Sequence, residues 1–207
     1  RRPCSAAWER RDGVTPRVGC VVMAAGNGAR FGSNKLLAEL DGRSLIQRAL
    51  DAVPAELLRA AVVVTQYPEV EALARGRGFQ VVVNDRPDWG ASYTVRLGLT
   101  ALGDVDGAMF LVSDQPLLRR ETVAGALGRF LGHPDRIVAL GCDGRRGNPC
   151  IFPRKFFPEL LALEGDRGGS AVIRAHPEAL LLYPASAEEL RDVDTVLALE
   201  GLRSRPE

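Results

Sequence analysis

Length, composition and charge limit what this chain can be. Its 207 residues suit one domain, or one domain with a small lobe, and 46% hydrophobic with 26% charged residues is typical of a folded globular protein rather than a disordered one. A net charge of +1 provides no broad basic field, so we expect neither nucleic acid nor an anionic membrane surface as a partner.

The sequence also argues against a membrane span, a signal peptide and a zinc site, the last because neither His133 nor His176 lies near a cysteine pair. No apolar run approaches the ~20 residues that a span requires, and residues 1–17 lack the apolar segment of a signal peptide. The four cysteines form no C-x-x-C pair, which is typical of free thiols in a reducing compartment. We therefore expect a cytoplasmic protein with a flexible extension over residues 1–17 and a single domain over residues 18–203.

An apolar run followed by a glycine-rich loop opens the expected domain. Val18–Met23 is short and rich in β-branched residues, as a buried parallel strand is. The loop that follows contains Gly26 and Gly28, and the cations Arg30 and Lys35 are spaced through it. Glycines permit positive φ and close approach of the backbone, and successive N–H groups in such a loop form a concavity that binds anions. The stretch predicts a loop wrapped around a polyphosphate.

Two common phosphate-binding loops do not fit this spacing. In the dinucleotide fingerprint G-x-G-x-x-G the third glycine would come one residue earlier, and a Walker loop requires G-K-[ST], whereas Lys35 is followed by Leu36. The remaining pattern is A-A-G-x-G-x-R-x-G-x-x-K, in which Arg30 would clamp phosphate oxygens and Lys35 would act as a point charge. The simpler alternative is a turn carrying two solvated cations.

Strand and helix patterns alternate along the rest of the chain. Strands are expected over residues 60–65, 79–83, 108–112, 136–140, 148–152 and 179–183, with a hairpin turn over residues 141–147. Helices are expected over about 44–53, from 68, and over about 93–102, 121–131, 156–163 and 171–175, with a last one after 195. This alternation predicts an α/β fold with a mostly parallel sheet flanked by helices, in which ligands lie outside the carboxyl ends of the strands.

Acidic residues follow at two places where segments end. Asp114 comes directly after the apolar run 108–112 and is well placed to hold Mg²⁺, although it could equally cap a helix. Asp192 and Asp194 form a second pair, which would share one face if the segment is extended, and one of them could also be a cap. Two separated carboxylates together with a triphosphate loop indicate metal-assisted nucleotidyl or phosphoryl transfer.

Six motifs in order make the comparison with known families specific. AAGNGARFGSNKLL, GASYTVRLGL, LVSDQPLL, GRRGNPCIF, LEGDRGGSAVI and DVDT resemble the molybdenum cofactor nucleotidyltransferases and, within them, the CTP:molybdopterin cytidylyltransferase branch, from about Val18 to Leu199. The resemblance implies a Rossmann-like nucleotidyltransferase fold, like that of nucleotide-diphospho-sugar transferases, with residues 18–116 binding mainly the nucleotide and 117–203 mainly the acceptor. It also implies transfer of CMP from CTP to the terminal phosphate of molybdopterin, giving molybdopterin cytosine dinucleotide and pyrophosphate, with Mg²⁺ or Mn²⁺ as cofactor.

The resemblance also implies roles for individual residues. The nucleotide would be bound by Ala24, Ala25, Gly26, Gly28, Asn84, Gly90, Ser92 and Thr94; the reaction would use Arg30, Lys35 and Asp114; the metal would bind Asp114 and Asp194; and the acceptor would contact Gly147, Asn148, Asp166 and Arg167. Ala25 favours cytosine, because the guanylyl branch usually has a glycine there. The chain departs from the family at Asn148, where histidine is common, and at Thr94, where serine is common.

Other functions compete with this prediction. One is another nucleotidyltransferase on the same fold, using GTP or a sugar phosphate acceptor. Another is a chaperone that binds molybdopterin and passes it to a molybdenum hydroxylase client, although retention of Arg30, Lys35, Asp114 and Asp194 favours catalysis. A dinucleotide-dependent oxidoreductase does not fit the spacing of the glycine loop.

Overall fold

Nine strands and seven α-helices are found in the described part of a computed structural model, which covers residues 15–26, 31 and 34–203. The main strands are β1 (Val18–Ala24), β4 (Ala60–Thr65), β5 (Gln80–Val83), β6 (Gly107–Val112), β7 (Ile137–Cys142), β8 (Arg145–Pro153) and β9 (Leu180–Pro184), and β2 (Glu39–Leu40) pairs with β3 (Arg43–Ser44). The helices are α1 (Leu45–Ala52), α2 (Pro68–Gly76), α3 (Ala91–Leu102), α4 (Arg120–Gly132), α5 (Phe157–Leu161), α6 (Ser170–Ala175) and α7 (Val196–Arg203). Short 3-10 helices cover Lys35–Leu37, Ala55–Leu57, Pro87–Trp89, Arg154–Phe156 and Pro177–Ala179.

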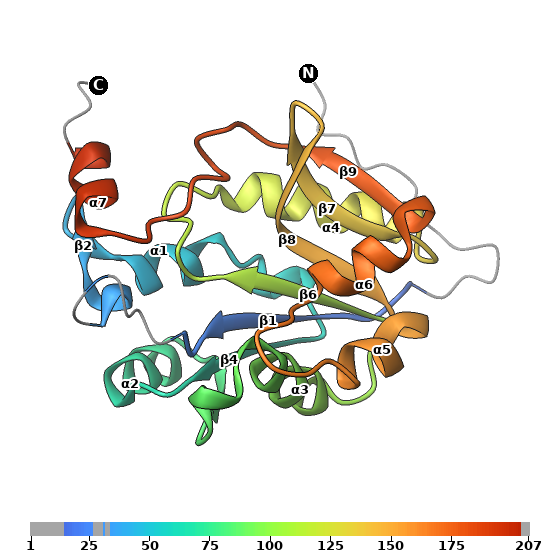
Figure 1. The fold of residues 1–207 in the computed structure, drawn as a ribbon, viewed down its shortest axis with the longest axis horizontal. Helices are drawn as coiled ribbons and strands as arrows, with labels where there is room; N and C mark the ends of the chain where they lie inside the picture. The colour runs from blue at the N-terminus through green and yellow to red at the C-terminus, as the bar shows by residue number, and fades with distance from the viewer. Residues whose placement is uncertain (1–14, 27–30, 32–33, 204–207) are drawn as a thin grey trace.

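The main sheet has seven strands in the order β5-β4-β1-β6-β8-β7-β9 (Figure 1). Strands β5, β4, β1 and β6 run parallel, as do β7 and β9, whereas β8 is antiparallel to both of its neighbours. The predicted α/β fold with a mostly parallel sheet is therefore confirmed. Because β8 runs the other way, its first residues lie at the same edge of the sheet as the carboxyl ends of the parallel strands.

The hairpin between β7 and β8 is tighter than the sequence predicted. The expected turn covered residues 141–147, but β7 continues to Cys142 and β8 already begins at Arg145. Asp143 and Gly144 alone form the turn, with φ of 49° and 75°. Positive φ at both central positions is the backbone of a two-residue hairpin turn, and the Asp-Gly pair is favoured there because both residues tolerate it.

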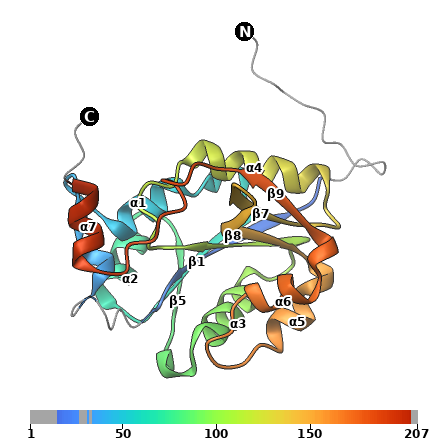
Figure 2. The same cartoon turned by 45° about the horizontal axis from the view of Figure 1, so that its top comes forward.

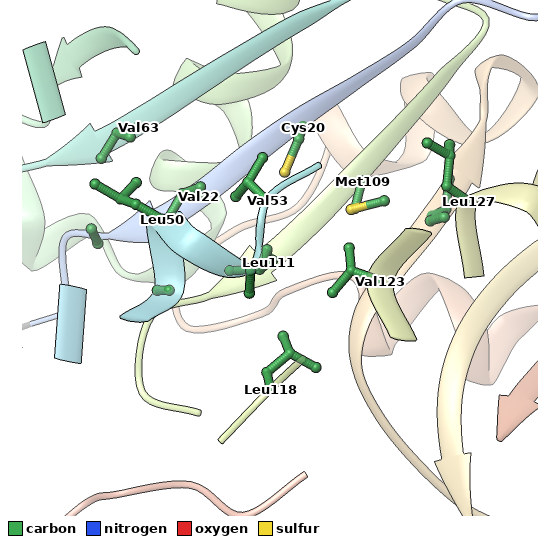
Figure 3. Packing of buried hydrophobic residues seen from close by; sticks show 14 of the residues in the cluster. Cys20, Val22, Leu50, Val53, Val63, Met109, Leu111, Leu118, Val123 and Leu127 are labelled. Carbon is green, nitrogen blue, oxygen red and sulfur yellow. The ribbon is translucent and has the colours of Figure 1, made fainter. Parts of the chain in front are cut away.

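Helices cover both faces of the main sheet. In Figure 2, α1 and α4 lie on one side, and α3, α5 and α6 lie on the other. Each face has its own buried cluster: Cys20, Val22 and Leu111 point to the α1 and α4 side (Figure 3), whereas Val21 and Phe110 belong to the opposite cluster. This alternation along β1 explains why the strand is apolar throughout, since a strand covered on both faces has no side left for water.

Local signals place several of the helices. The Ser44 hydroxyl accepts a hydrogen bond from Gln47 N, and the Gln47 side chain accepts one from Ser44 N, so the expected start of α1 is confirmed as a capping box. Pro68 opens α2 as expected. The helix expected from residue 93 begins earlier, at Ala91, because Gly90 adopts a φ of 81° and turns the chain directly into α3.

The last helix closes a third, smaller cluster at one end of the molecule. Leu199 and Leu202 of α7 pack with Leu40, Leu45 and Val193, and Figure 1 shows α7 beside β2. Among the described residues, no helix has the length and apolar character needed to cross a bilayer.

Candidate active site

The carboxyl ends of β1 and β6 meet at one edge of the sheet, as expected for adjacent parallel strands. Met23 of β1 lies opposite Val112 of β6, and Ser113, directly after β6, donates a hydrogen bond from its hydroxyl to the Met23 carbonyl over 2.8 Å. This bond fixes the first residues after β6 against the start of the glycine loop. Asp114 therefore lies beside the loop that the sequence predicts to bind phosphate.

A cavity of about 350 Å³ opens at this edge. It is formed by the segments that follow β1, β5 and β6, together with one residue from the loop before α6. Its lining consists of Met23, Ala25, Gly26, Lys35, Leu36, Pro87, Gly90, Ala91, Thr94, Val112, Ser113, Asp114 and Asp166. Six residues that we expected to bind nucleotide or act in the reaction are thus brought together: Ala25, Gly26, Gly90, Thr94, Lys35 and Asp114. We call this space the first cavity.

Lys35 joins the two expected metal carboxylates. Its Nζ donates to Asp114 Oδ2 over 3.0 Å and to Asp194 Oδ1 over 3.1 Å. The Lys35 side chain is 14% exposed and that of Asp114 is 24% exposed, so this ion pair is largely shielded from bulk water. Burial by itself would lower the pKa of Lys35, but the charges and hydrogen bonds of Asp114 and Asp194 outweigh it and raise the pKa above its ordinary value. Lys35 is therefore a firmly charged ammonium.

Three hydrogen bonds from two residues hold the segment that carries the distant Asp194 at this place. Val193 N donates to the Asp114 carbonyl over 2.8 Å. The Gln115 amide donates to the Leu190 carbonyl over 3.3 Å and to Asp192 Oδ1 over 2.9 Å. The two acids of the DVDT motif consequently have different partners: Asp194 pairs with Lys35 and Asp192 with Gln115. Burial and repulsion from Asp114 and Asp194 raise the pKa of Asp192, and the Gln115 hydrogen bond opposes that rise.

A second anchor of the same segment was not predicted from the sequence. The Glu189 carboxylate accepts hydrogen bonds from Ser186 N and from Ser186 Oγ, each over 3.1 Å, and forms an ion pair with Arg119 over 3.0 Å. Burial opposes the charged form, but Arg119, Thr122 and Ser186 together lower the pKa of Glu189 to about 2. The signal in the sequence is the capping-box pattern Ser-x-x-Glu at residues 186–189, since Glu189 N also donates back to Ser186 Oγ.

Residues after β4 support the start of the glycine loop, and these too were not predicted. The Gln66 amide donates to the Ala25 carbonyl, and the Tyr67 hydroxyl donates to the Gly26 carbonyl, each over 2.8 Å. They hold the backbone of the loop from the side of β4, at a separation of 41 residues. Gly28 and Arg30 lie outside the described residues, so their expected roles remain predictions.

The expected base-binding residues divide into two groups. Asn84 and Ser92 are each 2% exposed. The Asn84 amide donates to Thr94 Oγ1 over 3.1 Å, and its oxygen accepts from Arg86 N over 2.9 Å, so Asn84 shapes the loop from behind. Gly90 and Thr94, in contrast, line the first cavity. The direct contacts to a base that we expected from Asn84 and Ser92 thus have a competing structural explanation.

Gly90 is also where two loops meet. Ser92 N donates to the Gly165 carbonyl over 3.1 Å, and a Cβ at Gly90 would lie 2.6 Å from that carbonyl. This close approach carries Asp166 into the first cavity. We expected Asp166 and Arg167 to contact the acceptor. Asp166 instead lines the first cavity, with the residues expected to bind the nucleotide, and Arg167 is exposed.

A second cavity of about 680 Å³ shares no lining residue with the first. It contains Gly147 and Asn148, which we expected to contact the acceptor, and polar residues from four segments. Its lining is Gln115, Cys142, Asp143, Arg145, Arg146, Gly147, Asn148, Ser170, Ala187, Leu190 and Asp192. Asp114 lines the first cavity and its neighbour Gln115 lines the second, so the segment after β6 contributes to both.

The carboxylate oxygens around Lys35 suit a hard divalent cation as ligands. Asp114 and Asp194 point oxygen atoms at one position, now taken by the Lys35 ammonium, and Mg²⁺ or Mn²⁺ binds one or two carboxylates together with phosphate oxygens and water. Within the described residues, no group of three or more His, Cys, Asp or Glu side chains is placed to hold a metal alone. The arrangement therefore fits a cation that shares its ligands with a bound phosphate, rather than a closed protein site.

Comparison with known proteins agrees with this geometry. Residues 20–180 match the family model of the MobA-like NTP transferase domain. The bifunctional protein GlmU of Polaromonas naphthalenivorans is 32% identical over 136 residues, which is 61% of this chain and 26% of that protein. The chain spans about a quarter to a third of the length of the GlmU relatives that it matches.

Solved structures show the same fold. A homologue of Rv0371c from Mycobacterium sp. strain JC1 superposes with a TM-score of 0.77 at 25% identity, covering 92% of this chain and 97% of that one. Rv0371c of Mycobacterium tuberculosis, in complex with manganese, gives a TM-score of 0.70 at 22% identity over 90% of this chain and 97% of that one. A CMP:2-keto-3-deoxy-manno-octonic acid synthetase complexed with CTP gives 0.69 at 16% identity over 91% and 97%.

Proposed function

Because this chain belongs to the MobA-like NTP transferase domain family and contains a nucleotidyltransferase domain, we propose that it transfers CMP from CTP to the terminal phosphate of molybdopterin. The products would be molybdopterin cytosine dinucleotide and pyrophosphate. The observation that carries the proposal is the pairing of Lys35 with Asp114 and Asp194 at the edge of the first cavity, with Gln115, the neighbour of Asp114, lining the second. One cavity would hold the nucleotide, the other would hold the acceptor, and the reacting phosphates would meet beside Lys35.

The first cavity suits a nucleotide because it combines open backbone with charge. Ala25 and Gly26 present main chain to a ligand, while Lys35 supplies a positive charge within the cavity. Gly90 and Thr94 lie along the same cavity and would contact the base or ribose. The choice of CTP rests on the resemblance of the six motifs, on Ala25, and on the CTP-bound structural relative.

The chemistry follows from phosphate groups that are already nucleophilic. An oxygen of the acceptor phosphate would bond to the α-phosphorus of CTP, the bond from that phosphorus to the bridging oxygen would break, and pyrophosphate would leave. No strong general base is needed, so the protein must align the two phosphates and stabilise the growing negative charge. Lys35 would do this directly. A divalent cation bound by Asp114 and Asp194 would neutralise further phosphate charge.

The acceptor would occupy the second cavity. Arg145 and Arg146 could offset phosphate charge, while Asn148 and Gln115 provide polar groups for a heterocycle. We also propose that residues 18–116 bind mainly the nucleotide and residues 117–203 mainly the acceptor. Two residues are exceptions to this division: Asp166 lines the first cavity and Gln115 lines the second. A cytoplasmic reaction is proposed from the free cysteines, and a molybdenum hydroxylase client from the resemblance alone.

A second acceptor class comes from the structural relatives. The CTP-bound relative acts on a sugar acid, 2-keto-3-deoxy-manno-octonic acid. The same pair of cavities would accommodate that chemistry, with the sugar in place of the pterin. A molybdopterin chaperone would use the second cavity without turnover.

Mass identification of the product tests the proposal. The chain is incubated with Mg²⁺, with CTP, GTP, ATP or UTP, and with molybdopterin or a sugar phosphate, and pyrophosphate release is followed in parallel. We expect molybdopterin cytosine dinucleotide from CTP and molybdopterin, and no turnover by Asp114→Asn. A dinucleotide formed only from another nucleotide or acceptor would replace the proposed substrates. Binding of molybdopterin without any product would favour the chaperone.

A further inference from the structure

Lys35 occupies an unusual place among the cations of this chain. Of 27 basic residues, only Lys35 and Lys155 are lysines and the others are arginines. Lys155 lies over the ring of Phe156, whereas Lys35 is held between the two carboxylates of Asp114 and Asp194. A lysine presents a compact charge on a flexible stem, unlike the planar fork of arginine. The basic residue between Asp114 and Asp194 is thus a lysine, whose flexible stem lets the charge change position more easily than that of an arginine.

The backbone of Lys35 is fixed while its side chain has room to move. Leu36 N donates to Asn34 Oδ1, which caps the 3-10 helix Lys35–Leu37, and Ala38 N donates to the Lys35 carbonyl. The side chain borders the first cavity, next to Gly26. An anion bound in that cavity would therefore offer the ammonium a new partner without any change in the main chain.

The charges around Lys35 favour such an exchange of partners. Asp114 and Asp194 carry two negative charges, and the Lys35 ammonium 3.0 and 3.1 Å away offsets one of them. A divalent cation arriving alone would meet the ammonium already placed between its two ligands, and the two positive charges would repel each other. A triphosphate supplies negative charge that can attract the ammonium out of that position.

We infer that Lys35 takes the place of the divalent cation in the nucleotide-free protein, so that the cation enters together with a triphosphate as its chelate and not before it. This inference rests on the proposed function for the nature of the ligand. It assigns Lys35 two successive partners: first the carboxylates of Asp114 and Asp194, then the phosphates. The lysine would thereby keep the carboxylates together and free of metal until the nucleotide arrives.

Binding of Mn²⁺, followed by electron paramagnetic resonance, tests the inference without using turnover. The full chain is titrated with Mn²⁺ in the absence of nucleotide, as wild type, Lys35→Met, Lys35→Arg and the matched control Lys155→Met. We expect Lys35→Met to bind Mn²⁺ about tenfold more tightly than wild type, because the competing charge is gone. Lys35→Arg and Lys155→Met should bind as weakly as wild type. Equal or weaker binding by a folded Lys35→Met would overturn the inference.

The wild-type protein gives a second measurement that does not depend on any variant folding. Mn²⁺ is titrated with and without the non-reacting analogue α,β-methylene CTP, after subtraction of Mn²⁺ bound to the free analogue. We expect the analogue to increase Mn²⁺ affinity of the wild type by about tenfold or more. Micromolar Mn²⁺ binding by the wild type without nucleotide would overturn the inference.

The two proposals can fail separately. The nucleotide-free titration depends only on Lys35, Asp114 and Asp194, so its outcome is the same whichever nucleotide or acceptor the chain uses. If mass analysis finds no molybdopterin dinucleotide but Lys35→Met still gains Mn²⁺ affinity, the proposed substrates are wrong and the role of Lys35 stands. If the dinucleotide forms but Lys35→Met gains no Mn²⁺ affinity, the substrates are right and the role of Lys35 is wrong.

Discussion

Replacing Glu189 by glutamine should destabilise the protein in a way that depends on pH. The Glu189 side chain is 3% exposed and has Ser186 and Arg119 as partners. Its pKa of about 2 lies below the ordinary 4.5, and a gap of roughly 2.5 units at about 1.36 kcal/mol each corresponds to about 3 kcal/mol. Because the Arg119 side chain is 67% exposed and its charge is screened, we expect a loss of about 2 kcal/mol in the free energy of unfolding at neutral pH.

The sign of the pH dependence follows from the lowered pKa. Stabilisation by the Glu189 carboxylate is fully present above the ordinary pKa of 4.5 and is lost as the pH falls from there towards about 2. Urea unfolding of wild type and Glu189→Gln, followed by circular dichroism at pH 7 and pH 3, measures it. We expect less than half of the difference to remain at pH 3.

The exposed Glu69 of α2 provides a matched control, because Glu69→Gln removes a carboxylate that lies in solvent at the start of its helix. This control should change stability by a few tenths of a kcal/mol at most. A difference between wild type and Glu189→Gln that is the same at pH 7 and pH 3 would refute the electrostatic explanation. It would indicate that only the shape of the side chain matters.

Three further substitutions test the site and the fold. Asp114→Asn should lower turnover by at least about 10²–10³-fold, as removal of one charge-stabilising contact typically does, and pyrophosphate release close to wild type would contradict our assignment. Gly98→Ala should cost about 1–3 kcal/mol of stability, because its Cβ would lie 2.3 Å from Val21 Cγ1. Thermal melting measures this loss. Gly128→Ala, whose Cβ would meet nothing within 4 Å, is the control and should not destabilise the protein. Gly90→Ala should weaken CTP binding in calorimetry. Its φ of 81° disfavours a side chain, and the added Cβ would lie 2.6 Å from the Gly165 carbonyl. Unchanged affinity would show that this loop does not shape the nucleotide cavity.

The part of the fold that the sequence predicted is the part governed by local patterns. The apolar runs of β1 and β6 mark buried strands whatever their neighbours are. Ser44 marks the start of α1 because its capping partner Gln47 is three residues away. Asp114 could be placed at the ligand edge because it directly follows a buried parallel strand.

The remaining features depend on contacts between residues far apart in the chain. Gln115 reaches Asp192 across 77 residues, and no local pattern indicates that partner. The pairing of Asp194 rather than Asp192 with Lys35 depends on the hydrogen bond from Val193 N to the Asp114 carbonyl. Sequence spacing could identify both acids as candidates, but it could not distinguish them because alternation alone treats them alike.

The reversed strand β8 has a consequence for how such a domain can change its acceptor. The first cavity is built by segments after the parallel strands β1, β5 and β6, while Arg145, Gly147 and Asn148 of the second cavity all come from the first residues of β8. The hairpin that begins β8 turns on only Asp143 and Gly144 and can be replaced as one unit. Grafting it between relatives would exchange the hairpin's share of the second cavity while leaving the parallel strands behind the first cavity in register.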